Sequence, residues 1–402
     1  MKPSLKIQSP WENDSALKTL FQTLSQNGAT PYLVGGGVRD ALLGLRAEDE
    51  DIAINILPEE VMGLLDEAGI PHVPTGLSHG TITAVLKKRP YQITSLRTDI
   101  KTFGRHAEVA FTEDWIQDAS RRDFTINALY ADLEGTIYDP FGGIEDLHNH
   151  HVKFIGNPTK RIEEDYLRIL RFFRFSAFYG KGNLDSEGLA ACTRLAPQIR
   201  ILAKERITQE FLKLMKTPFV FPVLKTLQGS RILGVFLETT IDFEGLQKML
   251  EFERSLSFGP DPFLRLALSQ IQSTVLFSSL RLSNKEQLRY KKLENFQPIT
   301  AQNLSESLYR WGTETVRDWV ILQASKGGEF DSSWLQIIQS WTRPLFPLKG
   351  EDLMQRGIKG PALGNILHET EEWWISENFK PSYEACLNRL DQVLEKGNRE
   401  PV

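Results

Sequence analysis

The stretch Tyr32-Leu-Val-Gly-Gly-Gly-Val-Arg-Asp40 decides the fold of the first half of this chain. Its apolar start predicts a short strand, and the glycines predict a turn into a helix that begins near Val38. Gly35, Gly36 and Gly37 allow positive φ and a close approach of the backbone to a phosphate. The amides of the helix that follows would point at this phosphate. Arg39 adds a bidentate phosphate contact. Taken alone, the same glycines also fit a turn that serves geometry only.

Two carboxylates, Asp49 and Asp51, follow this turn at the start of a strand-like run, Ile52–Ile56. Residues i and i+2 of a strand point to one face, where two carboxylates repel unless cations lie between them. Magnesium bound by one or two carboxylates and substrate phosphates is common in nucleotidyl transfer. We therefore predict Asp49 and Asp51 as catalytic Mg²⁺ ligands. The alternative is a solvated acidic strand end, which the neighbours Glu48 and Glu50 favour.

Composition indicates an ordinary soluble globular protein. The 402 residues exceed what one core serves, so two or more domains are expected. The net charge of -5 argues against indiscriminate coating of nucleic acid, although a local basic groove remains compatible with it. No run has the length of a membrane span or a secretory signal, so we predict a cytoplasmic protein without a membrane partner. The two cysteines, Cys192 and Cys386, are predicted to be buried thiols.

The pattern along the chain predicts an α+β fold. Strands are expected at 32–34, 52–56, 81–86 and 91–96, with a hairpin at 87–90 and a helix at 58–69. From Lys160 onward apolar residues recur every three or four positions, which predicts an all-α second half. We place the boundaries at 1–145 for a mixed β-sheet domain with helices, 146–217 for a first helical region and 218–402 for the remaining helices.

Arg121, Arg122, Asp123 and Asn127 form a polar cluster within the segment 118–129. Arginines, an acid and an amide at this spacing suit contacts to a triphosphate and to ribose hydroxyls. A surface ion-pair cluster at a helix start is the alternative. The turn Asp139-Pro-Phe-Gly-Gly is interpreted as a rigid bend that connects the two halves.

A third cluster, Asp165, Arg168 and Arg171, is expected along one face of a helix over 165–178. Intrahelical salt bridging explains such spacing without any ligand. In a functional interpretation, an aspartate accepts from the exocyclic amine of cytosine or adenine, and an arginine donates to the adjacent ring nitrogen. Uracil and guanine present the opposite polarity, so the pair would select C and A without a nucleic-acid template.

The ordered set of motifs resembles the bacterial class II CCA-adding tRNA nucleotidyltransferases, and more loosely the bacterial poly(A) polymerases. The motifs that carry the resemblance are the glycine turn, Asp-x-Asp, and a series further along the chain: Thr75-Gly-Leu-Ser-His-Gly-Thr81, Arg121-Arg-Asp-Phe-Thr-Ile-Asn-Ala128, Asp139-Pro-Phe-Gly-Gly143, Glu164-Asp-x-x-Arg168 and Leu348–Gly364.

The resemblance implies a nucleotidyltransferase head followed by a helical neck, body and tail that hold the tRNA acceptor arm. It implies magnesium on Asp49 and Asp51, a triphosphate near Gly35, Gly36 and Arg39, and the ribose and phosphates near Arg121, Arg122 and Asp123. Asp165 with Arg168 would take the base edge. The segment Arg97–Glu113, with Gly104, corresponds to a mobile loop. Many relatives have a lysine and an aliphatic residue where this chain has Glu48 and Glu50, and some have a glutamate at Gln92, so no side chain is assigned as general base.

The resulting hypothesis is template-independent addition or repair of the 3′-terminal CCA of tRNA from CTP and ATP, by two-metal transfer that releases pyrophosphate. Poly(A) polymerase activity and CC-only or A-only addition are the close alternatives. A catalytically silent nucleotide- or RNA-binding protein is a rival of another class. A dinucleotide-dependent dehydrogenase is disfavoured because no G-x-G-x-x-G follows the first strand. The oligomeric state stays open.

Overall fold

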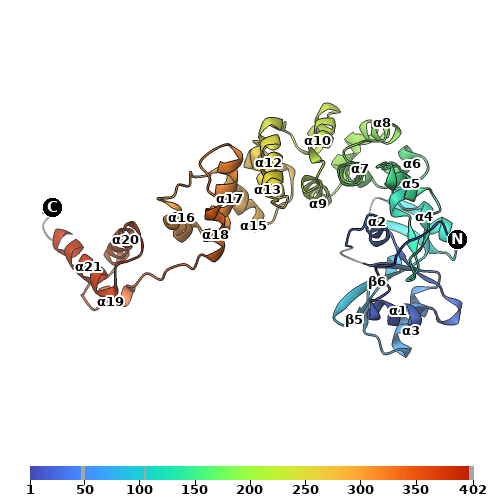
Figure 1. Ribbon diagram of the computed structural model, residues 1–402, viewed down its shortest axis with the longest axis horizontal. Coiled ribbons are helices and arrows are strands. Elements are labelled where there is room, and N and C mark those ends of the chain that lie inside the picture. The colour runs from blue at the N-terminus through green and yellow to red at the C-terminus, as the bar shows by residue number, and fades with distance from the viewer. Residues whose placement is uncertain (47–49, 104–105, 398–402) are drawn as a thin grey trace. The chain divides into compact units, whose positions relative to one another are not determined.

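The computed structural model describes residues 1–46, 50–103 and 106–397, which divide into two compact units (Figure 1). Unit 1 contains Met1–Phe243 with two short later segments, Pro260–Pro262 and Thr274–Leu282. Unit 2 contains Glu244–Gly259, Phe263–Ser273 and the chain from Ser283 onward. Among the residues with predicted roles, Glu48, Asp49 and Gly104 lie outside the described residues.

Eight strands of the described chain form one mixed sheet in the order β1-β10-β9-β2-β3-β6-β5-β4. Only β3 and β6 run parallel, whereas the other neighbours are antiparallel. A separate hairpin pairs β7 with β8. The strands are β1 (Leu5–Lys6), β2 (Pro31–Val34), β3 (Asp51–Ile54), β4 (His72–Gly76), β5 (Thr81–Leu86), β6 (Arg89–Ser95), β7 (Arg97–Phe103), β8 (His106–Phe111), β9 (Tyr130–Ala131) and β10 (Thr136–Tyr138).

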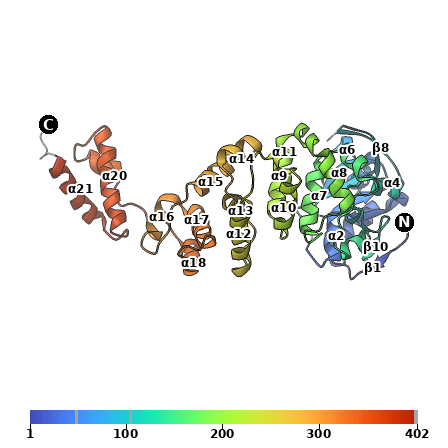
Figure 2. The same cartoon turned by 90° about the horizontal axis from the view of Figure 1, so that it is seen from above.

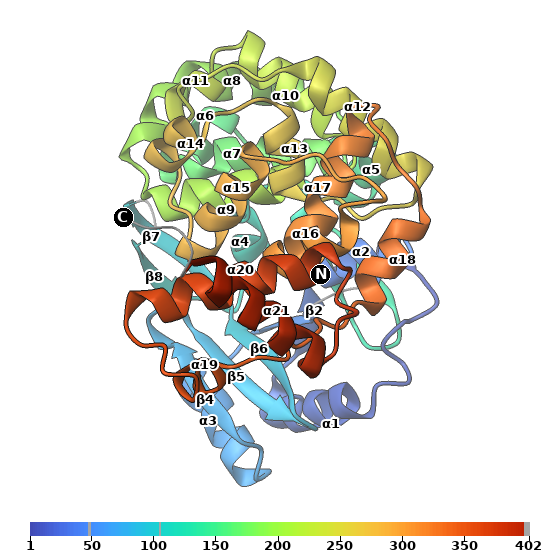
Figure 3. The same cartoon turned by 90° about the vertical axis from the view of Figure 1, so that its left-hand side faces the viewer.

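Alternation along the central strands gives the sheet two different faces. Ile52 and Ile54 of β3 enter one core with helices α1 (Ser15–Leu24) and α3 (Pro58–Glu67), which cover that face (Figure 3). Val34 and Ala53 point to the opposite face and pack in a second cluster with Tyr130. Because side chains two apart share a face, Asp51 lies on the same side as Ala53. Asp51, the described active-site candidate of β3, therefore faces away from α1 and α3.

The predicted strands and the first helices are confirmed, with small shifts at their ends. The hairpin between β5 and β6 turns at Lys87 and Lys88, which both have positive φ, so Arg89 and Pro90 already belong to β6. Helix α2 (Gly36–Leu42) begins two residues earlier than expected. The α+β fold class and the all-α second half are also confirmed.

Short helices complete unit 1 after the sheet. Asp139 accepts from the backbone N–H groups of Phe141, Gly143 and Ile144 and so fixes the turn into α5. Helix α6 then packs against both α7 and α8 (Figure 2). The elements are η1 (Gln26–Gly28), η2 (Leu77–His79), α4 (Trp115–Ser120), η3 (Thr125–Asn127), α5 (Gly143–His148), α6 (Pro158–Glu164), α7 (Leu167–Phe178), α8 (Ser186–Leu195), η4 (Ala196–Ile201), α9 (Lys204–Met215), α10 (Val220–Gly229) and α11 (Leu233–Phe236).

The chain from Ile299 onward buries two aromatic clusters in unit 2. One contains Trp319 and Trp334, and the other contains Tyr309 and Trp374. None of the helices in the described part of the chain is long and apolar enough to cross a membrane. The helices are α12 (Phe243–Ser255), α13 (Pro262–Leu268), α14 (Ser273–Ser279), α15 (Asn284–Glu294), α16 (Leu304–Trp311), α17 (Thr313–Ser325), α18 (Ser333–Ser340), α19 (Gly350–Met354), α20 (Pro361–Ser376) and α21 (Tyr383–Gly397).

One helix prediction is wrong. Asp165 does not share a helix face with Arg168 and Arg171, because α6 ends at Glu164 and α7 begins only at Leu167. Asp165 is extended, with φ -154° and ψ 107°. Its carboxylate accepts from the backbone N–H of Leu167 at 3.1 Å, a local bond that competes with helix continuation.

Candidate active site

The glycine turn between β2 and α2 lies against two arginine side chains. Gly35 has φ 73°, and its N–H donates to the carbonyl of Leu129 on the neighbouring chain segment at 2.9 Å. A Cβ at position 35 would lie 3.4 Å from Nη1 of Arg122, and one at position 36 would lie 3.5 Å from Nη2 of Arg39. The missing side chains of Gly35 and Gly36 thus leave room for two guanidinium groups beside the turn.

Arg39 is held in one orientation although it belongs to a short helix. The residue is only 7% exposed, and its Nη1 donates to Oδ1 of Asn127 at 2.5 Å. Its Nε donates to Oδ1 of Asp40 at 3.0 Å. These two contacts leave the third nitrogen, Nη2, as the one closest to the glycine turn.

Asp123 continues this network from the sheet domain to α7. Its Oδ1 accepts from Nδ2 of Asn127 at 2.9 Å, and its Oδ2 accepts from Nε of Arg171 at 2.7 Å. Burial opposes ionisation of Asp123, but Arg171 and Asn127 outweigh it and lower the pKa of the carboxyl to about 2. Asp123 is therefore a buried carboxylate that is charged at neutral pH.

Asp118 is a second buried carboxylate, and it accepts hydrogen bonds from the adjacent arginines Arg121 and Arg122. It is 1% exposed, and its Oδ1 accepts from Nε and Nη2 of Arg121 at 2.9 and 2.6 Å. Its Oδ2 accepts from Nη2 of Arg122 at 3.1 Å and from the hydroxyl of Tyr130 at 2.9 Å. Burial opposes the charge, but Arg122 and Arg121 lower the pKa of Asp118 to about 2. The alternative of a surface ion-pair cluster at a helix start is wrong, because these groups lie at the end of α4 around a buried carboxylate.

Asp51 begins β3 directly beside the glycine turn. It pairs with Val34, the residue before Gly35, and on its other side with Gln92 of β6. Its neighbour Glu50 is engaged elsewhere, in an ion pair with Arg89 at 2.9 Å. Asp49 lies outside the described residues, and the described part of the chain contains no group of three or more acidic, histidine or cysteine side chains arranged for a metal.

The predicted base-edge residues have separate partners. Asp165 accepts from Nη2 of Arg206 in α9 at 2.7 Å. Arg168 donates to the carboxylate of Glu164 and, through Nη2, to the carbonyl of Arg121 at 3.1 Å. The two residues are thus close along the chain, but each is fixed by a different element.

The sequence reasoning missed four residues that orient the predicted ones: Asp40, Asp118, Tyr179 and Arg206. Asp118 had a readable signal, since it precedes Arg121 and Arg122 by three and four positions in a helix. Arg206 is 41 residues from Asp165, and Tyr179 is 139 residues from Asp40, so no local spacing indicates either pair.

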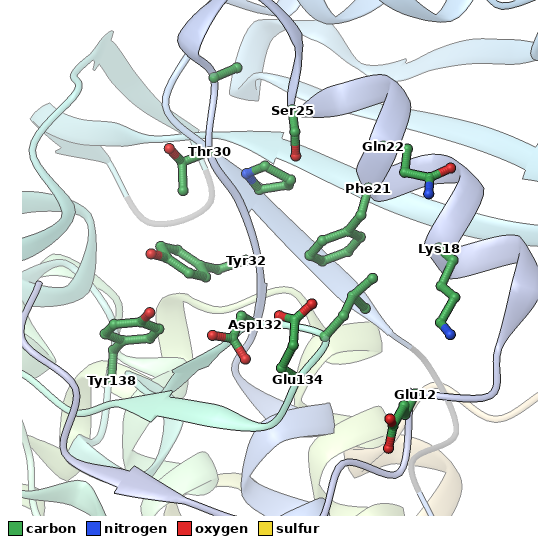
Figure 4. Close-up of a pocket in the computed structure, with 13 residues that line it drawn as sticks. Glu12, Lys18, Phe21, Gln22, Ser25, Thr30, Tyr32, Asp132, Glu134 and Tyr138 are labelled. Carbon is green, nitrogen blue, oxygen red and sulfur yellow. The ribbon is translucent and has the colours of Figure 1, made fainter.

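A cavity of about 710 Å³ lies elsewhere on unit 1, between α1 and the strands β2 and β10 (Figure 4). Tyr32 and Tyr138 line one side, and Lys18, Asp132 and Glu134 bring mixed charge. None of the predicted site residues that the structure describes lines this cavity.

Known proteins with similar sequences match nearly the whole chain. The CCA-adding enzyme of Bacillus cytotoxicus is 37% identical in an alignment of 397 positions that covers 93% of this chain and 97% of that protein. The mitochondrial CCA tRNA nucleotidyltransferase 1 of Danio rerio is 34% identical and covers 93% of this chain and 90% of its own length. This chain belongs to the CCA-adding tRNA nucleotidyltransferase family.

The family assignment agrees with the fold and with the domain models that match. The Poly A polymerase head domain model matches residues 31–153, and a model described as a probable RNA and SrmB-binding site of polymerase A matches residues 183–243. The crystal structure of Bacillus stearothermophilus CCA-adding enzyme in complex with CTP has a TM-score of 0.75 and 27% identity, and the match covers 95% of this chain and 98% of that one. The class II resemblance drawn from the motifs is confirmed.

Proposed function

We propose that this protein adds or repairs the 3′-terminal CCA of tRNA, with CTP and ATP as substrates and pyrophosphate as product. Identity to CCA-adding enzymes over nearly the full chain supports this activity. The single structural observation that carries it is the approach of two guanidinium groups, of Arg39 and Arg122, to the glycine turn beside Asp51. Cations and small residues at this place suit a nucleoside triphosphate.

Gly35, Gly36, Arg39 and Arg122 would hold the triphosphate. The arginines are preorganised because their other nitrogens already donate to Asn127 and Asp118. Preorganised charge needs no reorganisation when the phosphate charge redistributes during reaction. Arg121, Asp123 and Asn127 would contact the ribose and the phosphates.

Asp51, together with Asp49, would hold Mg²⁺. The exposed carboxylate of Asp51 fits this ion, since magnesium prefers oxygen ligands and Asp51 lies next to the proposed phosphate site. When bound, the ion supplies positive charge to the phosphates and lowers the pKa of a coordinated oxygen.

Asp165 and Arg168 would read the base edge, and Arg171, which donates to Asp123, would contact the nucleotide from the next turn of α7. Arg206 holds Asp165 and Glu164 holds Arg168, which fixes both groups before a base arrives. A carboxylate acceptor beside a guanidinium donor matches cytosine and adenine and opposes uracil and guanine.

In the reaction, the 3′ oxygen of tRNA forms a bond to the α-phosphorus as the bond to the pyrophosphate oxygen breaks. The protein side chains position the triphosphate and neutralise its charge, which is the main contribution a protein makes to such transfers. No described side chain is assigned as the base that takes the 3′-hydroxyl proton.

The decisive experiment supplies tRNA transcripts that end at the discriminator base, at C and at CC, each with one labelled nucleotide at a time. We expect two C additions and then one A. Unlimited A addition would support a poly(A) polymerase, and arrest after CC or addition of A alone would support a partial enzyme.

We further propose that residues 1–145 form the catalytic head, 146–217 the base-selecting neck and 218–402 the tRNA-binding body and tail. The proposed location is the cytoplasm, although relatives named as mitochondrial exist. Fractionation of cells with an antibody to the protein tests the location, and crosslinking to tRNA followed by peptide mapping tests the division of roles.

A further inference from the structure

Tyr179 directly follows the last residue of α7 and contacts α2, the helix that begins at the glycine turn. Its ring lies 4.0 Å from the guanidinium carbon of Arg39, measured to the ring centroid. Its hydroxyl donates to Oδ1 of Asp40 at 2.8 Å, the same oxygen that accepts from Nε of Arg39 at 3.0 Å. Tyr179, Asp40 and Arg39 therefore form a closed triangle of three pairwise contacts.

The triangle restricts Arg39, one of the two arginine side chains that the proposed function places at the phosphates. An arginine side chain has several rotatable bonds, and holding it for a ligand costs conformational entropy unless neighbours restrict it first. Stacking on an aromatic ring restricts the plane of the guanidinium, and the bond from Nε restricts its rotation. Asn127 then holds Nη1, so Nη2 is directed toward Gly36.

The hydroxyl of Tyr179 is suited to a permanent donor role. Burial is the largest cause that raises the pKa of Tyr179. The charge of Arg39 lowers this pKa, and the charge of Asp40 raises it. The phenol thus stays protonated at neutral pH and keeps its bond to Asp40. The ring of Phe175 stacks on Tyr179 with 5.7 Å between centroids and so supports it from the same helix.

The position of Tyr179 on α7 has a consequence for the reaction. Arg168 and Arg171 lie on the first half of this helix, where the base edge is proposed to bind, and Tyr179 follows its last residue. One helix therefore carries the proposed base-reading arginine, Arg168, at one end and is followed at the other by the residue that supports Arg39. We infer that Tyr179 is a positioning residue that, with Asp40, orients Arg39 toward the β- and γ-phosphates of the incoming nucleotide.

This inference rests on the proposed function, and the test compares CTP with CMP, which lacks the two outer phosphates. Binding of both nucleotides is measured by calorimetry for the full-length wild type and for Tyr179→Phe, Tyr179→Leu and Arg39→Ala. We expect Tyr179→Leu to weaken CTP binding about tenfold while CMP binding stays within about twofold, because only the outer phosphates meet Arg39. Tyr179→Phe keeps the stack and should recover most of the affinity for CTP.

The double variant Arg39→Ala with Tyr179→Leu separates positioning from a general structural role. If Tyr179 acts through Arg39, the double variant binds CTP as Arg39→Ala alone does. Tyr383→Leu is the matched control, since Tyr383 also donates to an aspartate, Asp352, but belongs to unit 2. It should leave the CTP to CMP ratio unchanged.

Three results would overturn the inference. Equal losses for CTP and CMP in Tyr179→Leu would indicate a structural role only, and so would additive losses in the double variant. An unchanged CTP affinity in Tyr179→Leu, with a loss in Arg39→Ala, would refute the role of Tyr179 and leave the proposed function intact. No loss in Arg39→Ala would instead refute the phosphate role of Arg39, on which both proposals depend.

Discussion

Replacing Asp118 with asparagine tests whether a buried carboxylate holds the arginine pair in place. The substitution keeps the shape of the side chain but removes the charge that faces Arg121 and Arg122. The pKa of Asp118 falls from 3.8 to about 2 on folding, a change that corresponds to roughly 2 to 3 kcal/mol of stability at neutral pH. We expect Asp118→Asn to lower the free energy of unfolding of unit 1 by about that amount.

The pH dependence gives the sign of this effect. A carboxyl whose pKa is lower in the folded state than in the unfolded state stabilises the fold fully above the unfolded value. That stabilisation is lost as the pH falls from about 4 toward 2. The difference in unfolding free energy between wild type and Asp118→Asn should therefore be constant between about pH 5 and 7 and should narrow below about pH 4.

The assay is urea unfolding, monitored by pulsed hydrogen exchange of peptides within residues 115–131. These peptides report on the unfolding of unit 1 alone. Asp66→Asn is the control, because the side chain of Asp66 is 76% exposed on α3 in the same unit. A loss below about 0.5 kcal/mol at pH 7, within the range of ordinary surface substitutions, would refute the reasoning. A difference that stays unchanged at low pH would refute it as well.

Three further outcomes follow from the same geometry. Asp51→Ala should lower nucleotide incorporation about a thousandfold with the circular dichroism spectrum unchanged, because a magnesium ligand contributes several kcal/mol to the transition state; near wild-type turnover would remove the metal proposal. Gly143→Ala should lower the unfolding free energy by about 1 to 3 kcal/mol, since the new Cβ would lie 2.7 Å from the backbone carbonyl carbon of Thr125; a thermal midpoint equal to that of wild type would contradict it. Arg206→Ala should reduce the preference for CTP over UTP about tenfold by releasing Asp165, as kcat/KM for each nucleotide will report; an unchanged ratio would show that Asp165 needs no partner.

The predicted strands and the switch to an all-helical second half came from local signals. Glycines after an apolar run, alternation in Ile52–Ile54 and proline at the start of α3 each act within a few residues. Such signals survive in the folded chain because they depend on backbone sterics and on which face is buried. The helix expected from Asp165 failed for a similarly local reason, since the carboxylate of Asp165 bonds the backbone N–H two residues on, at the break between α6 and α7.

The sequence by itself determined which residue types meet at the described part of the site: a glycine turn, the acid Asp51 beside it, and arginines. Only the tertiary structure decided which carboxylate neutralises which arginine. Asp123 pairs with Arg171 across 48 positions, Asp165 with Arg206 across 41, and Tyr179 reaches Asp40 across 139. Charged groups choose partners by distance through space and by shared burial, and spacing along the chain reports neither once the partners lie on different elements.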